Sequence, residues 1–249
     1  MFKLEVDQVS VELEGIPVLK QVCAQIRENT ITACIGPQGC GRGNFLRLFN
    51  RLNEVSGTGY KFTGEVKLDH KNVLALEPGV LRRRVGMLFR EPHIFAGSIL
   101  ENVSFGLRIQ GIKHKKFLAE VVERSLIAAE LWQAVKDKLN APVYALTTAQ
   151  RQFVCLARAL ALEPPVMLLE EPTFLLDTMS AYRMEELIYN LKRKHTVLIS
   201  TNSAHQASRL SDQTAFFHSG ELIEFGDTTR IFTNPASART ENYITGRFS

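Results

Sequence analysis

A glycine-rich stretch near the N-terminus has the residue types that hold a phosphate group. The apolar run from Ile31 to Ile35 is followed by nine residues of loop composition and then by the apolar pattern of 45–48. This order predicts a strand, a loop and a helix. Glycines let backbone N–H groups close on an anion, and a helix start adds the positive end of its dipole. The pattern favours a phosphate-binding loop, and a glycine-rich turn without a ligand is the alternative. The nine residues are Gly36, Pro37, Gln38, Gly39, Cys40, Gly41, Arg42, Gly43 and Asn44.

The end of this loop lacks two groups that a magnesium nucleotide requires. A phosphate-binding loop closes with Lys and then Ser or Thr, whereas this chain has Arg42, Gly43 and Asn44. Arg42 keeps a positive charge but has a wide planar guanidinium, and Gly43 has no hydroxyl to bind Mg²⁺. The sequence therefore predicts the fold of a phosphate loop with altered chemistry.

The surrounding pattern predicts an α/β protein in which short apolar strands alternate with helices. Two-residue periodicity in 1–35 and at 64–68 predicts antiparallel strands. Buried strands are predicted at 85–89, 166–169 and 196–200, and a hairpin at 215–224 around Ser219-Gly220. Residues 54–63 are predicted to form a surface loop, and the tail is predicted to form a helical turn with a polar end. Helices are predicted from the loop to about Asn53, at 99–139, 149–162 and 179–194, and at 205–210.

Composition excludes several classes of protein. The 249 residues are 45% hydrophobic and 22% charged, which suits one large globular domain. The formal charge of +4 comes from short, separated basic clusters, so we expect no nucleic-acid partner. No run approaches the roughly 18 apolar residues that span a bilayer, and the start lacks a signal sequence. We expect a cytoplasmic protein that reaches a membrane only through a partner.

Taken in order, five stretches resemble the successive motifs of an ABC-transporter ATPase. The chain is more narrowly similar to the ATP-binding subunits of Pst-type phosphate importers, in segments near 82–87, 101–103 and 220–227 and in the ending 232–248. The resemblance implies the ABC-ATPase fold, with a P-loop mixed sheet core, an antiparallel β subdomain and a helical subdomain. It implies one domain over 1–249, with 1–90 and 161–249 as core and 91–160 as the helical subdomain. The five stretches are Gly36–Asn44, Arg90, Leu146–Gln150, Glu170–Thr173 and Thr201-Asn202.

The resemblance also assigns a place to each candidate site residue. In the family two chains pair head to tail around two Mg-ATP, so the signature stretch of one chain, here Leu146–Gln150, faces the loop of the other. Glu171 then stands at the place of the general base. The loop residues, with Cys40 as a small packing residue, would contact phosphate. The other matching positions are Gly36, Gly39, Gly41, Gln150, Pro172, Thr173 and Asp177.

Several positions depart from the family pattern. Arg90 replaces a glutamine that reaches metal and water, and its cation cannot ligate Mg²⁺. Glu170 replaces the metal-linked aspartate and is a weak Mg²⁺ candidate, while Asn202 replaces the switch histidine. Glu12 and Leu13 stand where an aromatic ring would stack on adenine. The Ser-Gly-Gly part of the signature is replaced by Thr147, Thr148 and Ala149.

Three functions remain open from these residues. One is an ATPase that energises phosphate import. Another is a degenerate subunit with weak or no ATP hydrolysis, which binds permease subunits at the inner membrane and forms a homodimer or a heterodimer with another ABC ATPase. A third is a regulatory or anion-binding protein, with an inorganic anion at 39–43. A decayed copy without a role is the remaining alternative. Because phosphoryl transfer depends on positioning and charge, we expect weak ATP and Mg²⁺ binding and little turnover.

Overall fold

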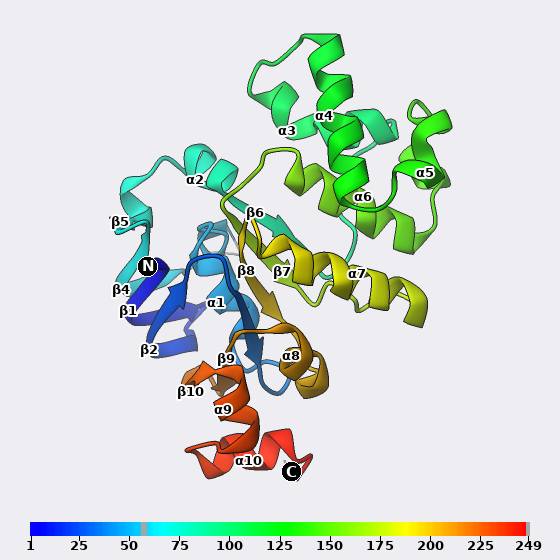
Figure 1. Ribbon diagram of the computed structural model, residues 1–249. Coiled ribbons are helices and arrows are strands. Elements are labelled where there is room, and N and C mark those ends of the chain that lie inside the picture. The colour runs from blue at the N-terminus through cyan, green and yellow to red at the C-terminus, as the bar shows by residue number, and fades with distance from the viewer. Residues whose placement is uncertain (56–58, 248–249) are drawn as a thin grey trace.

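Two sheets form the frame of the protein, and the computed structural model describes residues 1–55 and 59–247 of it. One sheet is antiparallel and the other is parallel except for its edge strand β10 (Figure 1). The antiparallel sheet has the order β2 (Ile16–Arg27), β1 (Phe2–Leu13), β4 (Lys61–Leu68) and β5 (Lys71–Asn72). The second sheet has the order β10 (Glu221–Asp227), β9 (Gln213–His218), β3 (Ile31–Ile35), β8 (Thr196–Ser200), β7 (Val166–Glu170) and β6 (Val85–Leu88).

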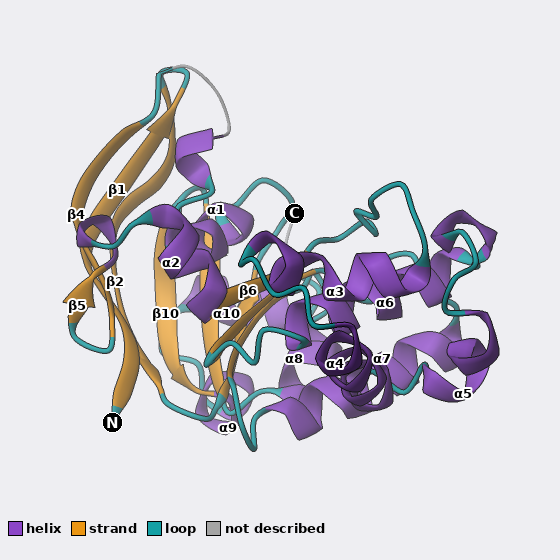
Figure 2. Ribbon diagram, turned by 90° about the horizontal axis from the view of Figure 1, so that it is seen from above, coloured by secondary structure: helices purple, strands orange, loops and turns teal. Residues whose placement is uncertain are grey.

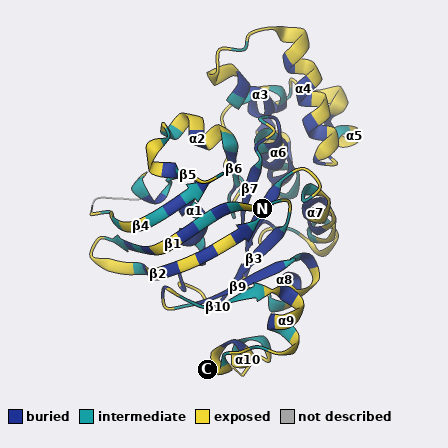
Figure 3. Ribbon diagram, turned by 60° about the vertical axis from the view of Figure 1, so that its left-hand side comes forward, coloured by how far each residue is buried: buried dark blue, intermediate teal, exposed yellow. Residues whose placement is uncertain are grey.

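The six-stranded sheet separates two hydrophobic cores, because successive side chains of a strand point to opposite faces. In β3, Ala33 faces one core and Cys34 the other, and in β9 the neighbours Phe216 and Phe217 divide in the same way. Figure 3 shows these strands as the buried centre of the molecule. The parallel strands therefore read as continuous apolar runs in the sequence, which is why they could be predicted.

Helices fill both cores. The helix α1 (Arg42–Leu48) packs between the two sheets, where Phe45 meets Phe49 edge-on at 5.3 Å and Phe217 at 5.0 Å. Most other helices lie on the opposite side of the six-stranded sheet (Figure 2). They are α3 (Ile99–Ile109), α4 (Lys115–Ala128), α5 (Trp132–Val135), α6 (Thr148–Leu160), α7 (Thr178–Leu191), α8 (Ala204–Leu210), α9 (Thr228–Thr233) and α10 (Ala238–Ile244). Helix α2 (Pro78–Arg84) lies on the side of α1, where its Leu81 joins the same core.

The predicted fold class is confirmed, and so is the helical nature of 99–139, which holds α3, α4 and α5. These helices and α6 gather at one end of the molecule (Figure 1). None of the helices in 1–55 or 59–247 is long and apolar enough to cross a membrane.

The secondary structure differs from the prediction in four places. The loop helix ends at Leu48 and not near Asn53, because Arg51 takes a positive φ of 58° that no helix continues. Strand β4 begins at Lys61, so the predicted surface loop is shorter, and its residues 56–58 lie outside the described residues. Helix α2 was missed, although Glu77 caps it and Pro78 begins it. The tail holds two helices, α9 and α10, instead of one turn.

Candidate functional site

The glycine-rich loop has the strand-loop-helix geometry that its sequence predicts. It connects β3, at the centre of the parallel sheet, to α1. Gly36 and Gly41 have φ of 147° and 100°, and a Cβ on Gly36 would lie 2.2 Å from the carbonyl oxygen of Phe217. At Gly41 a Cβ would lie 2.5 Å from the oxygen of Val18. Only glycine fits either place, so the loop depends on both residues.

Arg42 turns its guanidinium back into the loop and reaches Glu171. Its Nη1 donates to the backbone oxygens of Gly36 and Pro37, the latter at 3.1 Å. Its Nη2 donates to Oε1 of Glu171 at 2.7 Å, and both side chains are largely buried. Burial by itself would lower the pKa of Arg42, but the hydrogen bond and charge of Glu171 outweigh it and raise this pKa. Arg42 is therefore a fixed cation held by the candidate base.

Arg90 holds the other oxygen of the same carboxylate. Its Nε lies 3.6 Å from Oε2 of Glu171, and its guanidinium carbon lies 3.4 Å from the ring centroid of Phe174. The two arginines thus bracket one glutamate. A general base must have a carboxylate oxygen free to approach the attacking water, and both oxygens of Glu171 face guanidinium groups.

Glu170 is held in a similar way by Arg47, a residue of α1. The Nη2 of Arg47 donates to both carboxylate oxygens of Glu170, at 2.8 and 2.9 Å. A Cβ built on Gly43 would lie 2.9 Å from Oε1 of Glu170. The glycine thus leaves room for the longer glutamate, so two departures from the family pattern depend on each other.

The contact between positions 43 and 170 leads to a stability prediction. Gly43→Ser should lower the free energy of unfolding by ~1 kcal/mol, because the new side chain displaces Glu170 from Arg47. Glu170→Asp in the same protein should recover part of this loss, since the shorter acid retreats from the serine. Urea unfolding of the four proteins of the double-mutant cycle measures the coupling. Strictly additive effects would show that the two positions do not interact.

These side chains surround a small hollow at the carboxyl ends of the parallel strands, with a volume of about 180 Å³. Three guanidinium groups face two carboxylates, which leaves one net positive charge around the hollow. Burial raises the pKa of the Cys40 thiol, in keeping with a packing role for that residue. The hollow is lined by Gln38, Gly39, Cys40, Gly41, Arg42, Gly43, Asn44, Arg47, Arg90, Glu170, Glu171 and Ser200.

The donors around the hollow do not fit a magnesium ion. Mg²⁺ requires oxygen ligands in a strict octahedron. Gly43 offers no oxygen from its side chain, Arg90 brings a cation, and both oxygens of Glu170 are bound to Arg47. In the described part of the chain no three His, Cys, Asp or Glu side chains gather where they could hold a metal ion.

Other predicted site residues lie outside this hollow. Thr147 caps α6, where its hydroxyl accepts from the backbone N–H of Gln150 at 3.2 Å. The backbone N–H of Thr147 in turn donates to Oε1 of Gln150 at 3.1 Å. Thr148 and Ala149 follow in the first turn of this helix. Asp177 caps α7, and hydrogen bonds from Ser180 lower its pKa. A single chain does not bring the signature stretch to its own loop.

Two residues near the site were not predicted as part of it. Arg47 is one of many arginines, and nothing in its spacing distinguishes it from a solvated charge. Tyr243 lies in α10, some 200 residues from the loop, yet its hydroxyl donates to the carbonyl oxygens of Gly36 and Asn202. Only the sheet order, which places β9 beside β3, could have indicated this neighbour.

Comparison with known proteins agrees with this fold and loop. Residues 19–174 match the family model described as ABC transporter, and the chain belongs to that family. The phosphate import ATP-binding protein PstB of Bacteroides fragilis is 44% identical over 248 residues, which is 99% of this chain and 98% of that protein. The proteins of the same name from Bacteroides thetaiotaomicron and Cytophaga hutchinsonii are 45% and 46% identical, over 99% of this chain and 98% and 99% of theirs.

Solved structures show the same fold at lower identity. The structure of cbiO1 from Clostridium perfringens, part of the ABC transporter complex cbiONQ, has a TM-score of 0.79 at 23% identity and covers 99% of this chain and 96% of its own. A bacterial Atm1-family ABC exporter with ATP bound has a TM-score of 0.82 at 18% identity, over 99% of this chain and 42% of that one.

Proposed function

We propose that the chain is the nucleotide-binding subunit of a Pst-like ABC importer, that it binds nucleotide weakly, and that it turns over ATP slowly or not at all. The observation that carries this proposal is the position of Glu171 between Arg42 and Arg90. Because both oxygens of this carboxylate face guanidinium groups, neither is placed to take a proton from a water molecule. The similarity to phosphate import proteins supports phosphate as the solute of the assembly.

The same similarity supports the expected partners and location. We place the chain at the inner face of the cell membrane, bound to permease subunits through the helical segment 91–160. Two copies, or one copy and another ABC ATPase, would pair head to tail. In that arrangement Thr147 to Gln150 and Asp177, which lie away from their own hollow, would approach the loop of the partner subunit. The division into a core of 1–90 and 161–249 and a helical arm belongs to this proposal.

The charge around the hollow favours a second candidate, in which the protein binds an anion without metal. The hollow carries one net positive charge, and Arg42 and Arg90 would supply charge that Mg²⁺ otherwise brings. Inorganic phosphate, pyrophosphate or metal-free nucleotide could then occupy the loop from Gly39 to Gly43. An arginine fork binds phosphate oxygens in pairs, which suits this use.

Binding of nucleotide is predicted to be weak and independent of magnesium. Calorimetry should give a Kd for ATP of ~0.1–1 mM, which corresponds to a binding free energy of about −4 to −5.5 kcal/mol. Adding EDTA should change this constant less than ~2-fold, because both carboxylates of the hollow, Glu170 and Glu171, are bound to arginines. Pyrophosphate should bind under the same conditions, since the arginines recognise phosphate and not adenine.

The control is Arg42→Lys with Gly43→Ser, which restores the usual end of the loop. It should bind MgATP more tightly than the unmodified protein, and EDTA should remove the gain. Low-micromolar binding of MgATP by the unmodified protein, lost in EDTA, would contradict the proposal and favour the active ATPase.

A further inference from the structure

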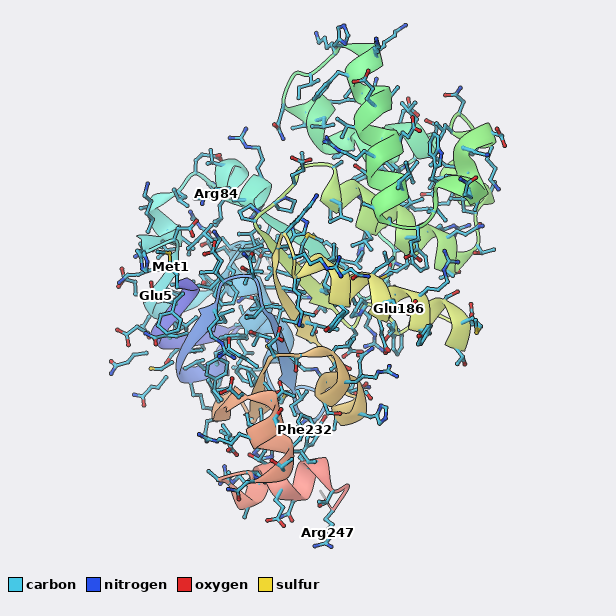
Figure 4. The ribbon with its side chains drawn as sticks, in the orientation of Figure 1. Met1, Glu5, Arg84, Glu186, Phe232 and Arg247 are labelled. Atoms are coloured by element: carbon cyan, nitrogen blue, oxygen red, sulfur yellow. The ribbon has the colours of Figure 1, made fainter. Side chains whose placement is uncertain are left out.

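The C-terminal helix α10 reaches the phosphate loop through one side chain. The ring of Tyr243 stacks on Phe216 of β9, with centroids 5.0 Å apart and planes inclined by 29°. Phe216 is fully buried, and its partner in the sheet is Ile35, the last residue of β3 before the loop. The tyrosine ring is thus fixed against the strand that leads into the site. In Figure 4 the labels of Phe232, on α9, and of Arg247, beyond the end of α10, mark where the C-terminal helices lie.

The hydroxyl of Tyr243 lies between two loops. It is 3.2 Å from the carbonyl oxygen of Gly36 and 3.1 Å from that of Asn202. A phenol has one proton, so both carbonyls share it in a three-centre bond. Burial raises the pKa of Tyr243, which keeps this proton in place at neutral pH. The first peptide of the phosphate loop and the peptide at Asn202 are thereby joined.

The two carbonyls follow neighbouring strands, since β3 and β8 pair in parallel and end side by side. The loop after β3 is the phosphate loop, and the loop after β8 holds Asn202 at the position of the family's switch histidine. The oxygen of Gly36 also accepts from Arg42, so Tyr243 and Arg42 meet at one atom. A change in the hydrogen bond from Tyr243 to Gly36 therefore affects the Arg42 guanidinium, which also binds Glu171.

We propose that Tyr243 is a positioning residue of the phosphate site, whose hydroxyl sets the distance between the phosphate loop and the loop at Asn202. This inference rests on the proposed function in so far as that site binds a nucleotide or another phosphate. Tyr243 touches no ligand in this arrangement. It acts through the backbone oxygens of the two loops.

Tyr243→Phe tests the hydroxyl while leaving the ring stacked on Phe216. Two amides report on the two loops in the free protein: Cys40 N–H, bound to Pro37 at 3.2 Å, and Ser203 N–H, bound to Thr201 Oγ1 at 3.0 Å. Hydrogen exchange followed by NMR should accelerate about fivefold at both, the factor of one net hydrogen bond. The amide of Val197, bound to Thr30 in the sheet, should be unchanged.

Ligand binding provides a second measurement. The Kd for pyrophosphate and for ATP should rise by a similar factor of ~5, because both ligands use the same loop. The matched control is Tyr189→Phe, which removes a hydroxyl from an exposed tyrosine of α7 and should alter neither exchange nor binding.

Each outcome decides the inference. Unchanged exchange at Cys40 and Ser203 would overturn it, and so would equal acceleration at Val197, which would indicate a general loss of stability. Faster loop exchange with an unchanged Kd would also overturn it, because the hydroxyl would then not position the site for a ligand. If the unmodified protein bound neither pyrophosphate nor ATP, the proposed function would fail, while the exchange measurement would still decide whether Tyr243 joins the two loops.

Discussion

The purified protein should release phosphate from ATP at no more than the background rate, and repair of the loop alone should not change this. Arg42→Lys with Gly43→Ser restores a compact phosphate contact and one hydroxyl. Arg90 remains beside Glu171 and repels a divalent metal by ~4 kcal/mol per unit-charge pair at 4 Å and an effective dielectric of 20. Because transition-state stabilisation needs metal, base and signature together, the rate should stay at background while affinity improves.

Turnover should appear only after Arg90, Asn202 and the signature positions are repaired together with the loop. Adding Arg90→Gln, Asn202→His and the signature changes Thr147→Ser, Thr148→Gly and Ala149→Gly should raise steady-state phosphate release by at least ~10²-fold, the typical effect of placing a general base correctly. Glu171→Gln in that protein should abolish the gain, which is the control. Robust hydrolysis by the unmodified protein that Glu171→Gln removes would refute the prediction and restore the ordinary importer ATPase.

In the unmodified protein, Glu171→Gln should lower stability instead of activity. The change leaves Arg42 buried next to a neutral amide and removes the charge that Arg90 faces. Loss of one partner of such a pair should cost ~2 kcal/mol, below the figure for a fully buried pair because Glu171 is partly exposed. For a chain of this length the melting temperature should fall by about 6 °C in differential scanning fluorimetry.

Two variants control this measurement. Glu123→Gln removes an exposed carboxylate of α4 and should leave the melting temperature unchanged. Arg42→Met combined with Glu171→Gln should recover most of the loss, because no unpaired cation remains in the loop. An unchanged or raised melting temperature for Glu171→Gln alone would mean that the ion pairs contribute nothing to the fold.

The elements of the core could be predicted because their signals are local. Ile31–Ile35 and Thr196–Ser200 are mostly apolar and buried throughout, and the helix after the loop has buried positions at regular spacing. The end of that helix could not be predicted, since it depends on the backbone conformation of Arg51. The missed helix α2 had a local signal in Glu77-Pro78, where the acid caps and the proline begins the helix.

The sequence predicted which residues form the site, but it did not predict which of their side chains form ion pairs. The loop sequence indicated a cation at Arg42, and resemblance indicated Glu171 and Arg90 as neighbours of the site. That both arginines bind the same glutamate follows from side-chain directions that only the packed sheet fixes. The contact of Glu170 with Arg47, and the room that Gly43 leaves for it, likewise depend on where β7 ends relative to α1.

The order of strands in the parallel sheet has a consequence for the way in which the chain is made. The loop strand β3 is among the first elements to be synthesised, yet its two neighbours, β8 and β9, begin only at Thr196 and Gln213. Such distant pairing is slow to form, and a strand whose partners are missing keeps its edges open. While the middle of the chain is being synthesised, β3 therefore lacks both of its partner strands. We therefore expect the phosphate loop to take its final shape only after about the last fifth of the sequence, which carries β8 and β9, has been synthesised.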